Sequence, residues 1–168
     1  TTEGNKNIED IVVGDIVQSW NIQTNKFVTS SVSEINHSHT VGDHLEGCQR
    51  AGYGECGVFK LIDADGQDLG LRFTPEHPFL TKDGWKAISP LVNQEPWLSQ
   101  QEEVLILQHG DFIKFDDSYK DDQGIGDGKW IQISSIEFEP MDASTTVYNF
   151  TVPEFNNYCA NFIAAHNK

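Results

Sequence analysis

The stretch that decides the fold lies near the C-terminus, at positions 147–167: VYNFTVPEFNNYCANFIAAHN. Its alternation of apolar and polar residues predicts two strands and a hairpin, which end on His166-Asn167. An asparagine amide nitrogen can attack its own backbone carbonyl, which closes a succinimide ring and expels the amine of the next residue, here Lys168. The leaving amine has to be protonated, and an adjacent imidazole suits that transfer near neutral pH. The ending is therefore a candidate site of peptide-bond cleavage in which His166 assists Asn167.

A second candidate motif lies at positions 73–85, FTPEHPFLTKDGW. Thr74 and His77 stand three residues apart at the predicted end of a strand, and each is followed by a proline. Because Pro75 and Pro78 favour extended geometry in the residues before them, we expect Thr74 and His77 to be held in a fixed, non-helical turn. A hydroxyl and an imidazole at this spacing can contact one peptide bond together, and so polarise its carbonyl or protonate its nitrogen.

The rest of the chain predicts a single all-β domain that spans residues 1–168. Short apolar runs alternate with polar residues and are separated by turn residues at regular intervals, as in a β-meander. Two segments with little alternation, 37–57 and 111–129, are expected to be loops inserted in the sheet. Short helical turns are expected at 7–11, capped by Asn7, and at 85–91, where Pro90 would end the turn.

Composition limits the classes of function. Asp and Glu number 26 and Lys and Arg 11, so the formal net charge is −15, and the basic residues are scattered along the chain. Proteins that grip nucleic acid need clustered Lys and Arg, so we expect no nucleic-acid partner. No apolar run reaches the roughly 18 residues that span a bilayer. The chain has 3 cysteines, an odd number that is not typical of a secreted domain stabilised by disulfides. We expect a soluble protein of a reducing compartment, the cytoplasm, with no membrane partner and no cofactor.

Taken together, three pieces of the sequence resemble the protein-splicing domains called inteins, and more broadly the Hint fold that inteins share with hedgehog autoprocessing domains. The segment 7–17 resembles the family's early Ile-Glu-Asp…Gly-Asp segment, the segment 74–78 its Thr-x-x-His motif, and the segment 147–167 its closing pair of motifs. The pieces occur in the family's order and cover about a third of the chain. The resemblance implies an all-β, horseshoe-like Hint fold that lacks its first N-terminal strand.

The resemblance also implies roles for four residues. Thr74 and His77 would activate the upstream scissile peptide for an N-to-S or N-to-O acyl shift. Asn167 would then cyclise with the assistance of His166, and the C-terminal junction would be cleaved. The implied activity is autocatalytic, single-turnover protein splicing.

The sequence departs from the family at several positions. Asn149 stands where the family usually has Asp, and Asn156 where it often has His, so two helpers are neutral amides that cannot shuttle a proton. Cys159, expected to be a small buried residue, lies close in sequence to the cleavage site; these three are candidate supporting residues. Phe162 replaces a usual Gly. Lys168 stands where a splicing precursor carries Cys, Ser or Thr, and a lysine amine is a poor substitute because it normally holds its proton.

The family's first nucleophile is a Cys or Ser upstream of the segment that matches the start of this sequence, and Thr1 falls at the wrong place for that role. Three explanations stay open. The nucleophile lies on a separate short fragment, so that this chain is the large C-terminal part of a split intein; or the sequence was trimmed; or the domain only self-cleaves. We favour the first, with the short N-terminal fragment and the flanking extein polypeptides as partners. The acidic chain would attract a basic fragment.

Residues 61–66, LIDADG, reproduce most of the LAGLIDADG signature of homing endonucleases. That signature forms a helix, occurs in two copies and accompanies a basic DNA-binding surface. Here a single copy lies in strand-like sequence of an acidic chain, so we expect a hairpin turn at Asp65-Gly66 and no endonuclease domain.

One segment carries side chains that zinc prefers. They are His37, His39, His44, Cys48 and Cys56. Their spacing matches no compact zinc finger, so we do not favour a metal site, and a Cys48–Cys56 disulfide stays open.

A different class of function, a carbohydrate- or protein-binding module, would need exposed aromatic platforms. The chain has tryptophans at 20, 85, 97 and 130. Trp20 and Trp130 lie in alternating strand sequence and are expected in the core, which disfavours this class.

Overall fold

The computed structural model describes residues 4–90, 103–116 and 127–166, which are mostly β-strands, as the sequence predicts. In these residues the strands are β1 (Ile16–Asn21), β2 (Lys26–Ser31), β3 (Glu34–Thr40), β4 (Gly57–Asp63), β5 (Phe79–Thr81), β6 (Gly84–Ala87), β7 (Leu105–Ile106), β8 (Phe112–Phe115), β9 (Lys129–Pro140), β10 (Thr146–Thr151), β11 (Asn157–Ala160) and β12 (Ile163–His166). The helical elements described are the 3-10 turns η1 (Ile8–Asp10) and η2 (Val41–His44) and the short helix α1 (Leu45–Arg50).

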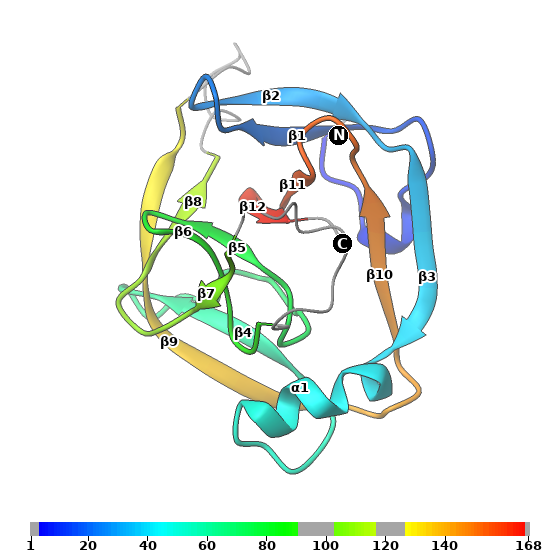
Figure 1. The fold of residues 1–168 in the computed structure, drawn as a ribbon, viewed down its shortest axis with the longest axis vertical. Helices are drawn as coiled ribbons and strands as arrows, with labels where there is room; N and C mark the ends of the chain where they lie inside the picture. The colour runs from blue at the N-terminus through cyan, green and yellow to red at the C-terminus, as the bar shows by residue number, and fades with distance from the viewer. Residues whose placement is uncertain (1–3, 91–102, 117–126, 167–168) are drawn as a thin grey trace.

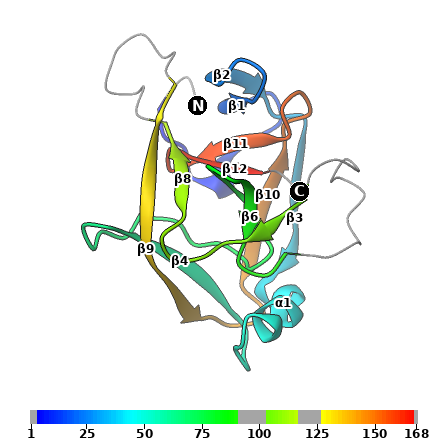
Figure 2. The same ribbon diagram turned by 60° about the vertical axis from the view of Figure 1, so that its left-hand side comes forward.

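The strands pair into a curled frame around a central hairpin. β1 pairs with β2 and β3 with β10, while the larger sheet has the order β4-β9-β8-β12-β5-β6-β7 with β11 paired to β12. Figure 1 shows the long strands β1–β4, β9 and β10 as a ring, with β5, β11 and β12 inside it. Figure 2 shows the β11–β12 hairpin running between β8 and β9 on one side and β3 and β10 on the other. The last strand of the chain therefore lies in the middle of the domain.

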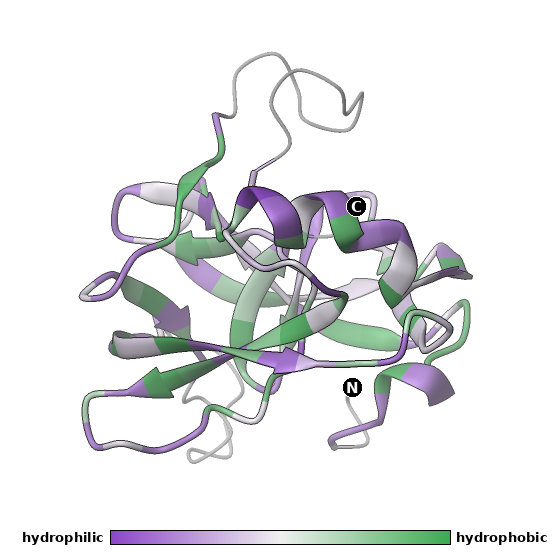
Figure 3. Cartoon of the chain, turned by 90° about the horizontal axis from the view of Figure 1, so that it is seen from below, coloured by the Kyte–Doolittle hydropathy of each residue, from purple (hydrophilic) through white to green (hydrophobic). Residues whose placement is uncertain are grey.

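Apolar residues fill the interior of this frame. The side chains of Phe59, Leu61, Ile113, Ile133 and Ile163 are at most 1% exposed. They come from β4, β8, β9 and β12, and each occupies the inward face of its strand. Figure 3 shows hydrophobic residues gathered on the strands, while the turns that join them are mainly hydrophilic. Burial of such side chains contributes about 1.5–3 kcal/mol each.

The prediction of a loop at 37–57 is wrong. This segment contains most of β3, then η2 and α1, and only its last part is irregular. β3 pairs with β10, where His39 lies opposite Val147, so ladder hydrogen bonds decide the structure of a polar strand that lacks alternation. Val41 and Cys48 are 0% exposed and anchor the helical turns to the core. Tertiary pairing, rather than local propensity, orders the segment.

Two other predictions need correction. The sequence predicts a helical turn at 85–91, but its described part, 85–90, contains none, because Gly84–Ala87 is β6 and pairs with β5 through Leu80↔Trp85. Gly84 has φ +107°, which lets the chain reverse tightly between the two strands. The predicted loop at 111–129 contains β8, which pairs with β5, β9 and β12, and it ends at the start of β9. Residues 117–126 lie outside the described part of the chain.

Other expectations for local structure are confirmed. Residues 8–10 form η1, although the Asn7 side chain makes no capping hydrogen bond and donates instead to Asp10. β4 ends at Asp63 and is followed by a turn in which Gly66 N donates to Asp63 O at 3.0 Å, so the LIDADG segment is a strand and a turn rather than a helix. Within the described residues, no helix has the length and apolar character that crossing a membrane requires.

A buried amide side chain joins the central hairpin to strand β1. Asn157 of β11 is 3% exposed. Its Oδ1 accepts from the Trp20 backbone N–H at 2.6 Å, and its Nδ2 donates to the Trp20 carbonyl at 3.0 Å and to the Phe155 carbonyl at 2.8 Å. Ser19 Oγ donates to the Asn157 carbonyl at 2.8 Å. The Asn157 side chain thus completes the hydrogen bonding of β1 in place of a neighbouring strand.

We expect Asn157→Ala to lower the free energy of unfolding by about 2–4 kcal/mol, because the buried N–H and C=O of Trp20 lose their partners. Urea denaturation followed by tryptophan fluorescence measures the change. Asn5→Ala, at an exposed position, is the matched control and should stay within about 0.5 kcal/mol of the parent. Equal stabilities of the two variants would contradict the assigned role of Asn157.

Candidate functional site

The Thr-x-x-His motif forms a fixed turn, as its two prolines predict. Phe73 exchanges backbone hydrogen bonds with Phe59 of β4, which brings the chain to Thr74 in extended form. His77 N then donates to Thr74 O at 3.1 Å, with Pro75 at the second position of the turn, where its fixed φ is favoured. The turn leads directly into β5. The motif is therefore held at both ends by the sheet.

The two candidate side chains of this turn differ in exposure. Thr74 is 7% exposed, whereas His77 is half-buried. The His77 ring lies 5.4 Å from the Phe79 ring and 6.4 Å from the Tyr158 ring, measured between centroids. Burial raises the pKa of Tyr158, so its hydroxyl stays protonated and remains a hydrogen-bond donor at neutral pH. Tyr158 was not singled out from the sequence, because its alternating strand context is typical of a core residue.

Strand β12 brings His166 to this turn. β12 pairs with β5 through Ala165↔Phe79 and with β8 through Ile163↔Phe115. His166 N donates to Pro78 O at 3.0 Å, and Pro78 directly follows His77. The His166 side chain is 2% exposed, and its ring lies 4.9 Å from the Trp85 ring at an interplanar angle of 84°. Asn167 lies outside the described residues.

Two cavities divide the remaining candidates. Thr74, His77 and Asn149 line a cavity of about 770 Å³. Asn156 and His166 line a smaller one of about 330 Å³. Of the two candidate supporting amides, Asn149 thus shares a cavity with Thr74 and His77, and Asn156 shares one with His166.

Cys159 lines neither of these cavities in the described part of the chain. It is packed against the cluster of Trp20, Phe27, Leu80, Trp85 and Ala164. Burial, together with the nearby Asp116 carboxylate, raises the pKa of the Cys159 thiol well above its ordinary value, so the thiolate is disfavoured. Cys159 itself is half-buried rather than buried, so the expected burial holds only in part, while its raised pKa fits a poor nucleophile.

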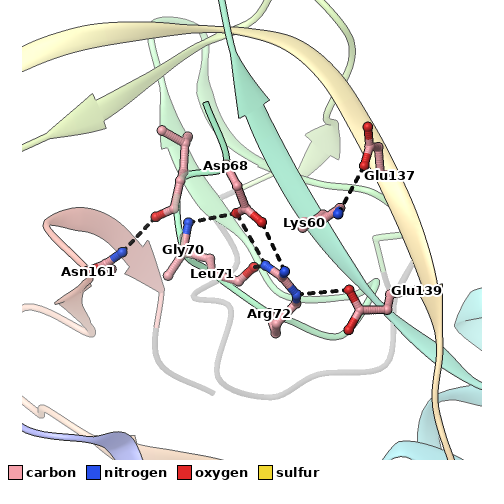
Figure 4. A network of polar contacts seen from close by, with 9 residues as sticks. Lys60, Asp68, Gly70, Leu71, Arg72, Glu137, Glu139 and Asn161 are labelled. Atoms are coloured by element: carbon pink, nitrogen blue, oxygen red, sulfur yellow. Dashed lines mark hydrogen bonds and ion pairs between the residues drawn. The ribbon is translucent and has the colours of Figure 1, made fainter. Parts of the chain in front are cut away.

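An ion-pair network holds the segment that leads into Thr74 (Figure 4). Arg72 donates to Asp68 at 2.9 Å and to Glu139 of β9 at 3.2 Å. The hydrogen bond from Arg72, reinforced by the Gly70 N–H, holds the pKa of Asp68 below its usual value. Asn161, in the turn before β12, donates to the Leu69 carbonyl at 2.7 Å. The ion pairs are partly exposed and contribute little stability. Together with the Asn161 hydrogen bond, however, they connect residues 68–72, which lead into the Thr-x-x-His turn, to the turn that leads into β12.

The turn also contains a buried carboxylate that the sequence analysis missed. Glu76 is 6% exposed, and its Oε2 lies 2.8 Å from Nδ1 of His44. No local pattern marks this pair, because the two residues are 32 positions apart. His44 had been considered only as a zinc-type ligand.

The five histidines and cysteines considered as zinc ligands do not come together as a metal site in the described residues. In the described part of the chain, no group of three or more His, Cys, Asp and Glu residues is placed to hold a metal ion. His37 packs its ring against Tyr148 of β10, and Cys48 is buried within α1. Cys48 and Cys56 are free thiols, so the disulfide left open by the sequence is not formed in this structure.

The three tryptophans within the described residues do not form an exposed platform. Trp20 and Trp85 are 5% and 6% exposed. Trp130 is half-buried, with Lys114 Nζ 4.7 Å from its ring centroid, and Trp97 lies outside the described residues. The expectation that Trp20 belongs to the core is confirmed. The described tryptophans therefore give no support to the binding-module alternative.

No family model matches this sequence, and no curated protein matches it. Solved structures do match its fold, and they include inteins and an intein-like domain. The curled β frame with the C-terminal hairpin at its centre is therefore the Hint fold of the inteins, as the three sequence motifs predict.

Three of the matching structures cover nearly the whole chain. The DnaB intein from Synechocystis sp. PCC 6803 has a TM-score of 0.66 and 22% identity, over 97% of this chain and 86% of that one. For the gp41-1 intein the TM-score is 0.62 and the identity 20%, over 99% and 91% of the two chains. For the intein-like domain from Clostridium thermocellum these values are 0.59 and 24%, over 95% and 86%. At such identities the likeness establishes the fold.

The three thiols should react with iodoacetamide in an order set by burial. Cys56 and Cys159 are both half-buried and Cys48 is 0% exposed, but the thiol pKa is raised by burial at Cys48 and at Cys159. We expect native protein at pH 8 to be alkylated first at Cys56, with the other two slower by about 100-fold. Peptide mass spectrometry over time measures the order, and 8 M urea, which should equalise the three rates, is the control. Cys159 reacting as fast as Cys56 would contradict the assigned packing.

Proposed function

We propose that this chain is the C-terminal part of a split intein. In this proposal it activates an upstream scissile peptide bond with Thr74 and His77, and it cleaves its C-terminal junction by cyclisation of Asn167 with His166 assisting. The observation that carries the proposal is the hydrogen bond from His166 N to Pro78 O, at 3.0 Å. It places the last motif of the chain directly beside the Thr-x-x-His turn. The fold of the matching inteins supports the same assignment.

The larger cavity suits the N-terminal step. Its volume of about 770 Å³ is sufficient for a short extended peptide beside Thr74 and His77. The Cys or Ser of that peptide follows the last residue of the upstream flank, and its thiol or hydroxyl loses its proton as it attacks the carbonyl carbon of that flank residue. The carbon–nitrogen bond breaks, His77 gives a proton to the leaving amine, and a thioester or ester forms. In this proposal the Thr74 hydroxyl hydrogen-bonds the polarised carbonyl oxygen.

The nucleophile-bearing peptide is the partner that this proposal requires. We propose that it is a separate short fragment, which would complete the Hint domain with its first strand. The flanking exteins are the polypeptides that the reaction joins. The same chemistry would follow if the peptide preceded residue 1 in one continuous chain, so both arrangements belong in the test.

The C-terminal step takes place beside His166. The Asn167 amide nitrogen attacks the Asn167 carbonyl carbon, the bond to residue 168 breaks, and the new amine takes up a proton that His166 supplies. Because the His166 side chain is 2% exposed and packed against Trp85, few water molecules reach it. A shielded site favours ring closure over hydrolysis.

One observation favours a second candidate, a Hint domain that cleaves without ligating. Lys168 follows Asn167, and a lysine ammonium cannot accept an acyl group until it loses its proton. Such a domain would release what lies downstream of Asn167 without joining the flanks. The two candidates give different products in one assay.

We expect the chain, extended beyond Asn167 by a Cys-initiated peptide, to yield a ligated product when it is mixed with a peptide in which an upstream flank precedes the N-terminal Cys segment. Intact-mass spectrometry under reducing conditions detects the product. A single-chain fusion of the same segment is assayed in parallel, and His77→Ala is expected to slow N-terminal cleavage by about 10²–10⁴-fold in either format. Cleavage without ligation would select the second candidate. No mass change in either format, with the fold intact, would refute both.

Asn167→Ala should abolish release of the downstream peptide, because alanine has no amide that can form the ring. The N-terminal thioester should still form in this variant and remain cleavable by hydroxylamine. His166→Ala should slow the release by about 10²–10⁴-fold, since it removes the proton donor. Asn5→Ala serves as the control for a general effect of amide loss. Release that persists in Asn167→Ala would remove this residue from the mechanism.

A further inference from the structure

The carboxylate of Glu76 ties the Thr-x-x-His turn to helix α1. Glu76 lies between Thr74 and His77, and its side chain is 5% exposed. Its Oε2 lies 2.8 Å from His44 Nδ1, and its Oε1 lies 3.7 Å from Nη2 of Arg50. Glu76, His44 and Arg50 line the same cavity as Thr74 and His77, and within it the carboxylate has one partner on η2 and one on α1.

Arg50 also holds the other side of the same turn. Its Nε donates to Ser89 Oγ at 3.0 Å, and Ser89 N donates to the Pro75 carbonyl at 2.8 Å. Arg50 thus contacts Glu76 directly, and it is linked to the Pro75 carbonyl through Ser89. The Arg50 guanidinium therefore contacts both the Glu76 carboxylate, which His44 also holds, and the residue that binds the turn's backbone.

Helix α1 approaches the turn so closely that only glycine fits at the contact. A Cβ added at Gly47 would lie 2.6 Å from the Glu76 carboxyl carbon and 2.8 Å from a ring carbon of Pro75. Gly47 and Glu76 are both buried. The α1 backbone at Gly47 therefore packs directly against the Glu76 carboxylate.

We propose that Glu76 is a positioning residue for the N-terminal acyl shift, which fixes Thr74 and His77 by its buried hydrogen bond to His44 and its ion pair with Arg50. This inference rests on the proposed function, because it concerns how the same site is kept in order. A buried carboxylate is stable only while its partners stay in place, so the turn cannot shift without leaving a charge unpaired. A displacement of about 1 Å at reacting groups can cost on the order of 10²-fold in rate.

The position of Glu76 makes the effect specific to one step. Thr74 and His77 lie on either side of Glu76 in the chain. His166 N also bonds to Pro78 O, but the β12 ladder with β5 and β11 and the contact with Trp85 hold His166 without using Glu76. Loss of Glu76 should therefore disturb the N-terminal step and leave Asn167 cyclisation in place.

The experiment measures the two cleavage rates in five variants of the full chain with the Cys-segment peptide. We expect Glu76→Ala and His44→Ala each to slow N-terminal cleavage by at least 10-fold while C-terminal cleavage changes less than 2-fold. The double variant should be no slower than Glu76→Ala, because both changes break one contact. Glu76→Gln keeps an acceptor for His44 and should stay within about 3-fold of the parent. Glu55→Ala, an exposed carboxylate after α1, is the control.

A second readout does not depend on cleavage. In the chain alone, the imidazole resonances of His77 in a ¹H–¹⁵N spectrum should move in the same direction in Glu76→Ala and His44→Ala, and should not move in Glu55→Ala. Unmoved His77 resonances, or equal losses in both cleavage steps, would overturn the positioning role. If the parent cleaves nothing, the proposed function fails while the resonances still decide the inference. Should Glu76→Ala not fold, His44→Ala and Glu76→Gln carry the same comparison.

Discussion

The structure depends on the insertion of one short strand, β12, beside β5. Its hydrogen bond from His166 N to Pro78 O joins the last described residue to the residue that follows His77. β12 also pairs with β8 and β11, so it receives neighbours from three parts of the chain. Because Ile163, Ala164 and Ala165 are 0% exposed, the strand has no solvent face that would tolerate a shift in register. The position of His166 relative to the Thr-x-x-His turn is thus set by core packing.

The sequence predicts the parts of this arrangement that follow from local rules. Alternation identifies β4, β9 and β10, and the prolines at 75 and 78 predict the fixed turn at 74–77. The order of three motifs was enough to predict the Hint fold, which the solved inteins confirm. The roles of the site residues stay predictions: Thr74 and His77 lie in the fixed turn and His166 N bonds to Pro78 O, and their chemistry belongs to the proposal.

Contacts between distant segments could not be predicted in this way. Glu76 pairs with His44 across 32 positions, and neither residue carries a local signal for the other. The polar strand β3 has almost no alternation, so only its pairing with β10 makes it a strand. Trp85 was expected in a helical turn, but its position opposite Leu80 in the β5–β6 hairpin buries the ring. In each case the partner, rather than the residue, decides the structure.

The central place of β12 has a consequence for the order of events during synthesis. β5 and β8 are made early, but β5 lacks one of its neighbours until residues 163–166 have left the ribosome. Neither cavity can reach its final shape before then, because His166 lines one and the β11–β12 hairpin closes the other through Tyr158 and Ala160. For the proposed reaction, the order of synthesis would therefore delay the first step: the upstream scissile bond would stay unreactive until the residues next to the downstream junction have been made.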